Sequence, residues 1–306
     1  MDSINTEKEL CTLVNDLYES EQSDFLEKMI DIFSDEKIES FPKALNNKAY
    51  YCYKNNYSAV SGQSFYDYSL SLLSKAISVD NVSYKSYMLM GEIYFKTHKY
   101  ESSLNSYRQA LNISQNINSL NNTAVMFHYL GENEKAEALL KKASEISDSS
   151  IVWYNYALEC AFNHKSAEAK KKLSKITTDD DIDDIDIGRI RFLIEDYEEV
   201  YRLYEKSYSN ILPNVIDLSI YLYTLKKLNK MEIYDEISKS SIELIEGYIN
   251  EFENSDTINY YKRLLSELKK AIISITQNHH FDLNIFPYFK EVCYLYYCKI
   301  HPNIYD

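Results

Sequence analysis

Apolar and small residues recur along the chain at intervals typical of amphipathic helices. One set comprises Tyr87, Met90, Gly91 and Tyr94, and a second set, after a polar turn, comprises Ser103, Tyr107 and Ala110. The i, i+3, i+4, i+7 spacing of the first set places its members on one face of a helix. The pattern therefore predicts two helices that pack as a hairpin.

The same set of positions recurs twice, each time 33 residues further on. The first recurrence gives Leu120, Thr123, Ala124, Phe127, Ala136, Leu140 and Ala143. The second gives Trp153, Tyr156, Ala157, Cys160, Ala169, Leu173 and Ile176. A period between about 20 and 50 residues is typical of a solenoid of stacked units. A small residue in each first helix (Gly91, Ala124 or Ala157) lets the second helix approach closely.

This arrangement resembles the tetratricopeptide repeat, most clearly in the copy that reads VWYNYALECAFNHKSAEAKKKLSKI. The resemblance is clearest over residues 84–180, and weaker copies extend it to residues 42–242, or about six hairpins. It implies an all-α fold, a superhelical solenoid of antiparallel helical hairpins whose first helices line a concave surface.

Terminal units of a solenoid have to cover its exposed apolar ends. We therefore expect residues 1–41 to form a helical N-terminal cap and residues 243–306 a helical C-terminal cap. At the N-terminus, residues 6–33 are predicted to form two helices. Towards the C-terminus, three further helices are predicted at residues 237–252, 256–277 and 285–300.

Composition supports an all-α protein and narrows the classes of partner. The chain of 306 residues has 45% hydrophobic residues, only 5 Gly and 4 Pro, and a formal net charge of −14. Sheets and phosphate-binding loops need many more turn residues than this. Nucleic-acid affinity depends largely on Lys and Arg, so the negative charge argues against a nucleic-acid partner.

The resemblance also predicts which residues face the concave surface. These groove positions are aromatic with scattered polar side chains, and they are Tyr50, Tyr53, Met88, Glu92, Phe95, Asn122, Tyr129, Tyr154, Asn155, Phe162, Arg189, Phe192 and Tyr223. An aromatic stripe of this kind can bind a partner, or it can be covered by the C-terminal helices of the chain itself. Both interpretations stay open from the sequence.

An acidic run follows the third clear hairpin, with carboxylates at Asp179, Asp180, Asp181, Asp183, Asp184 and Asp186. Three alternate aspartates resemble the start of a calcium loop, but no Gly follows and Ile190 stands where the closing Glu is needed. Carboxylates at the start of a helix are expected from capping alone. Cys293, Cys298 and His301 match no ordinary zinc module. We therefore predict no metal, no cofactor and, because no catalytic motif is present, no enzymatic activity.

The sequence thus predicts a scaffold that binds a peptide or a helix of a protein partner in an aromatic groove. The alternatives are an acidic inhibitor or immunity protein for a basic enzyme or toxin, and a peptide-sensing regulator. No signal peptide or membrane span is apparent, so we expect a cytoplasmic protein without membrane contact. Exposed repeat edges and the apolar sequence FPYFKEVCYLYYCKI leave a homodimer open.

Overall fold

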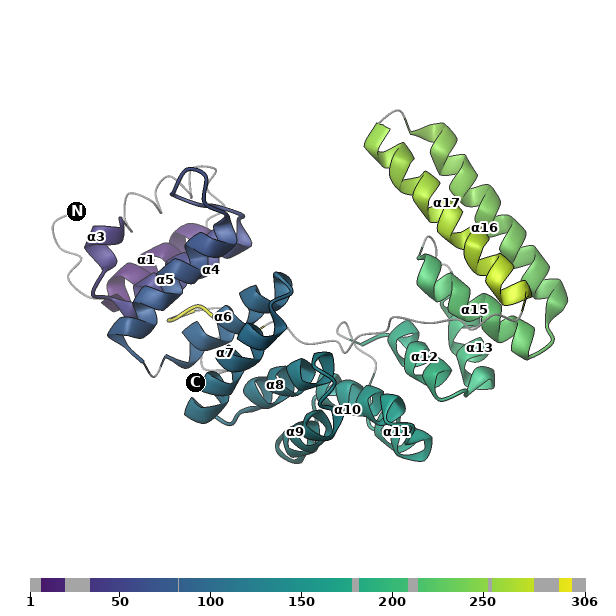
Figure 1. Ribbon diagram of the computed structural model, residues 1–306, viewed down its shortest axis with the longest axis horizontal. Coiled ribbons are helices and arrows are strands. Elements are labelled where there is room, and N and C mark those ends of the chain that lie inside the picture. The colour runs from purple at the N-terminus through teal and green to yellow at the C-terminus, as the bar shows by residue number, and fades with distance from the viewer. Residues whose placement is uncertain are drawn as a thin grey trace. The chain divides into compact units, whose positions relative to one another are not determined.

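The protein consists of helices that pack against their neighbours in the chain. The computed structural model describes residues 7–19, 34–81, 83–177, 182–208, 214–252, 255–277 and 292–298, and every regular element among these residues is an α-helix. The chain divides into two compact units (Figure 1), residues 1–147 together with 289–306, and residues 148–288. The C-terminal residues therefore return to the unit in which the chain begins.

Among its described residues, the first unit contains three helical hairpins preceded by two further helices. Helices α1 and α3 both contact α4, the first helix of the first hairpin. The helices of this unit are α1 (Glu7–Glu19), α3 (Asp35–Ile38), α4 (Pro42–Lys54), α5 (Phe65–Val79), α6 (Tyr84–Lys96), α7 (Tyr100–Ile113), α8 (Ile117–Tyr129) and α9 (Asn133–Ile146).

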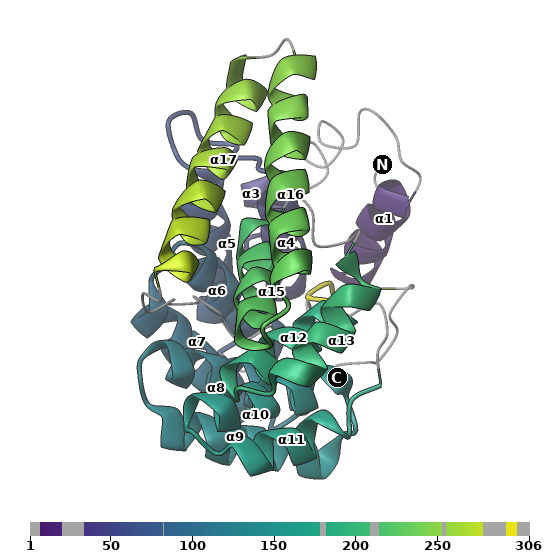
Figure 2. The ribbon, with the colours of Figure 1, turned by 90° about the vertical axis from the view of Figure 1, so that its right-hand side faces the viewer.

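In the part that the structure describes, the second unit also contains three hairpins, and a long helix follows them. Figure 2 shows that long helix, α17, beside α16, and it also contacts α15. The helices of this unit are α10 (Ser150–Phe162), α11 (Ser166–Leu173), α12 (Asp184–Leu193), α13 (Tyr197–Lys206), α15 (Val215–Lys227), α16 (Met231–Glu251) and α17 (Ser255–Thr276).

The predicted fold of antiparallel helical hairpins is confirmed, and so is its register. The small residues at the start of the second helices, Ser103, Ala136 and Ala169, are all fully buried. The Ser103 hydroxyl donates a hydrogen bond of 2.7 Å to the carbonyl of Gly91, so the two helices of that hairpin touch at their small residues. The predicted cap boundary at residue 242 falls inside α16.

Each hairpin turn has the same backbone geometry. The second residue after the first helix adopts a left-handed conformation, with φ between 54° and 74°, at Asn56, His98, Gly131, His164, Glu195 and Asn229. The next amide then donates back across the turn, as Lys99 does to the carbonyl of Tyr94 at 2.8 Å. This is the Schellman motif, which satisfies carbonyls that have no partner within the helix.

Glycine at one of these turns should stabilise the protein. Glu195 is exposed and has φ +59°, a conformation that costs a residue with a Cβ atom roughly 1 kcal/mol or more. We expect Glu195→Gly to raise the free energy of unfolding by about 0.5–1 kcal/mol, because glycine adopts this φ without strain. Urea unfolding followed by circular dichroism measures the change. The matched control Glu236→Gly, in the exposed interior of α16, should have the opposite sign.

In each hairpin, one residue of the first helix faces one residue of the second helix, and the sizes of these two residues are complementary. A Cβ atom added to Gly91 would lie 2.5 Å from Cε1 of Tyr107, and one added to Gly188 would lie 2.2 Å from Cε2 of Tyr204. The equivalent pairs in the other four hairpins, all of them buried, are Ala49 with Leu73, Ala124 with Leu140, Ala157 with Leu173, and Leu222 with Ser238. Glycine therefore occurs where the facing residue is tyrosine, and the largest residue faces the smallest.

Candidate functional site

The first unit holds a stretch of its own C-terminal chain along the first helices of its hairpins. Residues 292–298 lie beside α4 and α6 (yellow in Figure 1). They are not helical: residues 292–295 have no regular secondary structure, and the chain then turns at Tyr296 and Tyr297. The prediction of a helix over residues 285–300 is therefore wrong over 292–298. Hydrogen bonds from α4 to the backbone take the place of the helical bonds.

Two adjacent asparagines of α4 make the central contacts with this segment. The Asn47 side-chain oxygen accepts from the Tyr296 amide at 2.7 Å, and its nitrogen donates to the Tyr296 carbonyl at 3.1 Å. Asn46 donates to the Tyr294 carbonyl at 2.6 Å, while its own oxygen accepts from Ser86 at 3.0 Å. Both asparagines are completely buried. Their side-chain amides therefore form hydrogen bonds with backbone groups of the segment, as the backbone of a neighbouring β-strand does.

Tyr294 occupies a buried position between α4 and α6, and its side chain is only 1% exposed. Its ring centroid lies 6.2 Å from that of Tyr50. Burial raises the pKa of the Tyr294 hydroxyl well above its ordinary value, and the nearby Glu92 carboxylate raises that pKa further. Glu92 also accepts a hydrogen bond of 2.8 Å from Tyr53. Three of the predicted groove residues, Tyr50, Tyr53 and Glu92, therefore lie at this position.

Tyr296 and Tyr297 lie among lysines. The Lys43 nitrogen is 5.4 Å from the ring centroid of Tyr296 and the Lys85 nitrogen is 5.0 Å from it, on the scale of cation–π contacts. The Tyr296 hydroxyl lies 2.7 Å from Ser83 Oγ. Lys43 donates to the Tyr297 hydroxyl at 3.0 Å, and that hydrogen bond raises the pKa of Lys43. The segment therefore meets positive charge on a protein that is acidic overall.

Four further groove candidates form two similar aromatic clusters, one in each unit. In the first, Tyr129 lies 5.1 Å from both Phe95 and Tyr100, measured between ring centroids. In the second, Tyr223 lies 5.4 Å from Phe192 and 6.1 Å from Tyr197. Each cluster joins the two helix ends at the turn of one hairpin to the first helix of the next hairpin. Its rings are half-buried, which suits packing between repeats as well as contact with a partner.

The remaining groove candidates differ in how accessible they are. Met88, Asn122, Tyr154 and Asn155 are buried, whereas Phe162 is half-buried. Buried side chains of this kind serve first in packing between helices. Their role in binding a partner stays a prediction.

Arg189, another groove candidate, belongs to a charged network inside the second unit. Its guanidinium donates to both carboxylate oxygens of Asp217, at 2.8 and 2.7 Å, and to Asp186 at 2.9 Å. Asp217 also accepts from the Tyr204 hydroxyl at 3.1 Å. The hydrogen bond to Asp217 is the main cause of a raised Arg189 pKa. These bonds orient Arg189 toward its own unit.

The described part of the acidic run is also engaged internally. Asp183 caps α12 and forms a capping box with Asp186, whose amide donates to Asp183 at 2.8 Å. Burial raises the pKa of the Asp186 carboxyl, and the neighbouring Asp183 adds to the rise. Asp184 pairs with Lys206 at 2.6 Å. The other members of the run, residues 179–181, lie outside the described residues.

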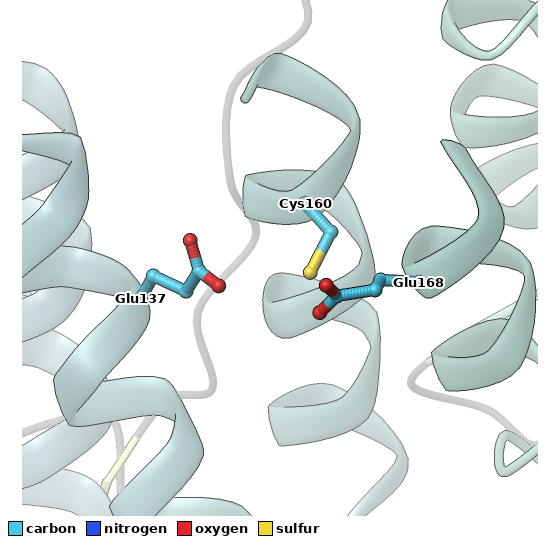
Figure 3. A group of neighbouring side chains, drawn as sticks. All are labelled: Glu137, Cys160 and Glu168. Carbon is cyan, nitrogen blue, oxygen red and sulfur yellow. The ribbon is translucent and has the colours of Figure 1, made fainter. Parts of the chain in front are cut away.

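Figure 3 shows Cys160 on α10 beside Glu168 on α11, both within the second unit. Cys160 is buried and Glu168 is exposed. The third side chain drawn, Glu137, belongs to α9 of the first unit. Of the zinc candidates in the sequence, Cys293 and Cys298 are half-buried, and His301 lies outside the described residues.

Comparison with known proteins identifies the fold. No protein-family model matches the chain. The photosystem I assembly protein Ycf3 of Acaryochloris marina is 27% identical over 146 residues, which cover 46% of this chain and 88% of that protein. The structure of PilW, a type IV pilus biogenesis factor, matches with a TM-score of 0.59 and 15% identity over 77% of this chain and 98% of PilW. A tetratricopeptide repeat protein of Parabacteroides merdae matches with a TM-score of 0.52 and 17% identity over 77% of this chain and 96% of that structure. The chain has the tetratricopeptide repeat fold.

Within this repeat fold, the polar residues that hold the segment are not among the groove positions predicted from the sequence. They are Asn15, Lys43, Asn46, Asn47, Ser83 and Lys85. The signal that could have found them is the pair of adjacent asparagines among the buried positions of α4, because asparagine is seldom buried without a specific partner. Among the described helices of this repeat protein, none is long and apolar enough to cross a membrane.

Proposed function

We propose that this protein is a non-catalytic interaction scaffold whose first unit binds an extended segment of a partner protein along α4 and α6. One observation carries the proposal: this surface already accommodates seven residues of non-helical polypeptide, 292–298. A surface that pairs with a peptide backbone through side-chain amides is suited to peptides from other chains by the same chemistry.

The polarity of the contacts supports an extended peptide over a helix as the ligand. A helical ligand has its backbone groups already paired within the helix. Asn47 needs a free amide and a free carbonyl from a single residue, and Tyr296 supplies both. A non-helical chain offers such pairs, so the α4 surface is complementary to non-helical polypeptide.

The names of two similar proteins agree with this class of function. One is an assembly protein of photosystem I, and the other is a biogenesis factor of type IV pili. We extend only the general role of binding proteins to this chain. The alternative of an acidic inhibitor is less favoured, because Asp183, Asp184 and Asp186 are all bound within the second unit.

Peptide selection tests the proposal directly. An open variant, Tyr294→Ala/Tyr296→Ala, weakens the hold of the chain's own segment and leaves every residue of α4 and α6 unchanged. The full-length open variant is used to select binders from a random peptide library displayed on phage, and synthetic copies are then measured by fluorescence anisotropy. We expect selected peptides to lose at least about tenfold in affinity when Asn47→Ala is added, because two hydrogen bonds to the backbone disappear.

The matched control for Asn47→Ala is Asn105→Ala, the same chemical change at an exposed position on α7. It should change affinity by less than about twofold, because surface substitutions away from a contact have small effects. Selected peptides that bind both variants equally well, or a library that yields no binder, would overturn the proposed function. Far-UV circular dichroism of each variant establishes that the helical fold is retained.

A further inference from the structure

We infer that the site on α4 and α6 selects peptides with the pattern Tyr-Leu-Tyr, and that the chain's own residues 294–296 occupy it until such a peptide displaces them. The inference rests on the proposed function and specifies the partner of the same site. The partner is an extended segment of another protein that presents two tyrosines at alternate positions.

The first tyrosine is specified by a buried position. Tyr294 is enclosed beside Tyr50, and the adjacent Glu92 carboxylate favours a neutral hydroxyl group that can donate a hydrogen bond. A large aromatic side chain fills this space and supplies that donor. Phenylalanine would fill the space and lack the donor, and an aliphatic residue would leave part of it empty.

The second tyrosine is specified by charge and by a hydroxyl partner. The Tyr296 ring lies between Lys43 and Lys85, and its hydroxyl reaches Ser83. Lysines above an aromatic ring attract its negative face. The intervening residue is held by its backbone, since Lys85 donates to the Leu295 carbonyl at 3.2 Å, and its own side chain is buried.

The backbone contacts extend beyond the tripeptide and suit a non-helical stretch that ends in a turn. Asn15 of α1 donates to the carbonyls of both Tyr296 and Tyr297, at 3.2 and 3.0 Å. Its own oxygen accepts from the Tyr51 hydroxyl at 3.0 Å, which orients the amide. Side chains from α1, α4 and α6 therefore converge on four consecutive residues of the segment.

The covalent link makes residues 294–296 a competitor of any partner. The chain leaves the first unit at residue 147, forms the second unit, and returns to the first at residue 289. A tethered ligand acts at an effective concentration that reaches the millimolar range for short flexible links. A free peptide can bind only to molecules whose site is open. Its apparent affinity is the intrinsic affinity multiplied by the fraction of such molecules.

A labelled peptide tests both parts of the inference on the full-length protein. The probe is fluorescein-Val-Ser-Tyr-Leu-Tyr-Tyr-Ser, which is the sequence of residues 292–298 with serine in place of both cysteines. We expect the open variant Tyr294→Ala/Tyr296→Ala to bind the probe at least about tenfold more tightly than the unmodified chain, because its own segment competes less. A scrambled probe, and a probe with alanine at the position of Tyr294, should bind the open variant at least about tenfold more weakly.

The outcomes separate the inference from the proposed function. Equal affinity of the probe for the unmodified chain and the open variant would overturn the competition. An open variant that binds library peptides without tyrosines, and binds this probe no better than its scramble, would overturn the Tyr-Leu-Tyr specificity and leave the proposed function standing. Failure of every peptide would overturn both.

Two further measurements complete the test. Tyr294 is part of the core, so the milder variant Tyr296→Ala, at a half-buried position, is measured in parallel and should shift affinity in the same direction. Sedimentation of the unmodified chain across concentrations reveals any exchange of segments between copies. A dimer that Tyr294→Ala/Tyr296→Ala abolishes would overturn the intramolecular assignment, because a second copy would then supply the segment.

Discussion

Replacing Asp217 by asparagine should lower the free energy of unfolding of the second unit by about 3 kcal/mol, the range found when one partner of a buried ion pair is removed. Asp217 is 2% exposed and receives three hydrogen bonds, two from Arg189 and one from Tyr204. Asparagine keeps the shape of the side chain but offers one acceptor oxygen in place of two and removes the charge. Arg189 then stays partly buried with its main counter-charge gone.

Urea unfolding of the full chain, followed by circular dichroism, measures this loss. The matched control is Asp184→Asn, which makes the same chemical change in an ion pair with Lys206, whose side chain is 69% exposed. Exposed pairs contribute at most about 1 kcal/mol, so the control should lose less than that. Equal losses in the two variants would contradict a special role for the buried network.

A double substitution distinguishes the cost of leaving one buried charge unpaired from the contribution of the ion pair itself. We expect Arg189→Met/Asp217→Leu to lose less than Asp217→Asn alone, because replacing both charges by apolar groups leaves neither one unpaired. A loss in the double variant as large as the sum of the losses of Arg189→Met and Asp217→Leu would mean that the two residues are not energetically coupled.

The sequence was informative about the repeats because their signals are local. The small residues that let helices approach, such as Gly91 and Ser103, recur at a fixed distance and are buried where the pattern predicts. The periodicity that defines a helix needs only the residues within it. The hairpin fold could therefore be predicted without knowledge of any distant contact.

The site was harder to predict because its contacts join distant parts of the chain. Tyr294 and Asn46 are 248 residues apart, and their hydrogen bond is one of the contacts that hold residues 292–298 in a non-helical conformation. Aromatic residues at intervals of three and four also suit a helix, so the local pattern predicted the wrong element there. Arg189 shows the same limit, since its partner Asp217 lies 28 residues away in the next hairpin.

The contact between Gly91 and Tyr107 gives the second large prediction. A methyl group on Gly91 would lie 2.5 Å from the Tyr107 ring, which is fully buried and packed in the core of the first unit. Overpacking of this kind costs about 1–3 kcal/mol, and the better helix propensity of alanine offsets about 1 kcal/mol of it. Because the Tyr107 ring is fully buried, we expect the overpacking cost to be near its upper value of about 3 kcal/mol. After the offset from helix propensity, Gly91→Ala should lower the free energy of unfolding by about 2 kcal/mol. Gly247→Ala, in α16 with nothing within 4 Å of the added Cβ atom, should instead raise it.

The other hairpins indicate how the loss can be repaired. Tyr107→Leu alone should cost about 2–3 kcal/mol, because it leaves a cavity beside Gly91. Gly91→Ala/Tyr107→Leu reproduces the pair Ala124 and Leu140 of the next hairpin, so the new methyl group occupies space that the ring has vacated. Urea unfolding of all four proteins should therefore give a double-mutant loss about 2 kcal/mol smaller than the sum of the single losses. Additive losses would mean that the Gly-Tyr and Ala-Leu pairs are not interchangeable solutions to one packing problem, and that the backbone spacing of each hairpin is set elsewhere.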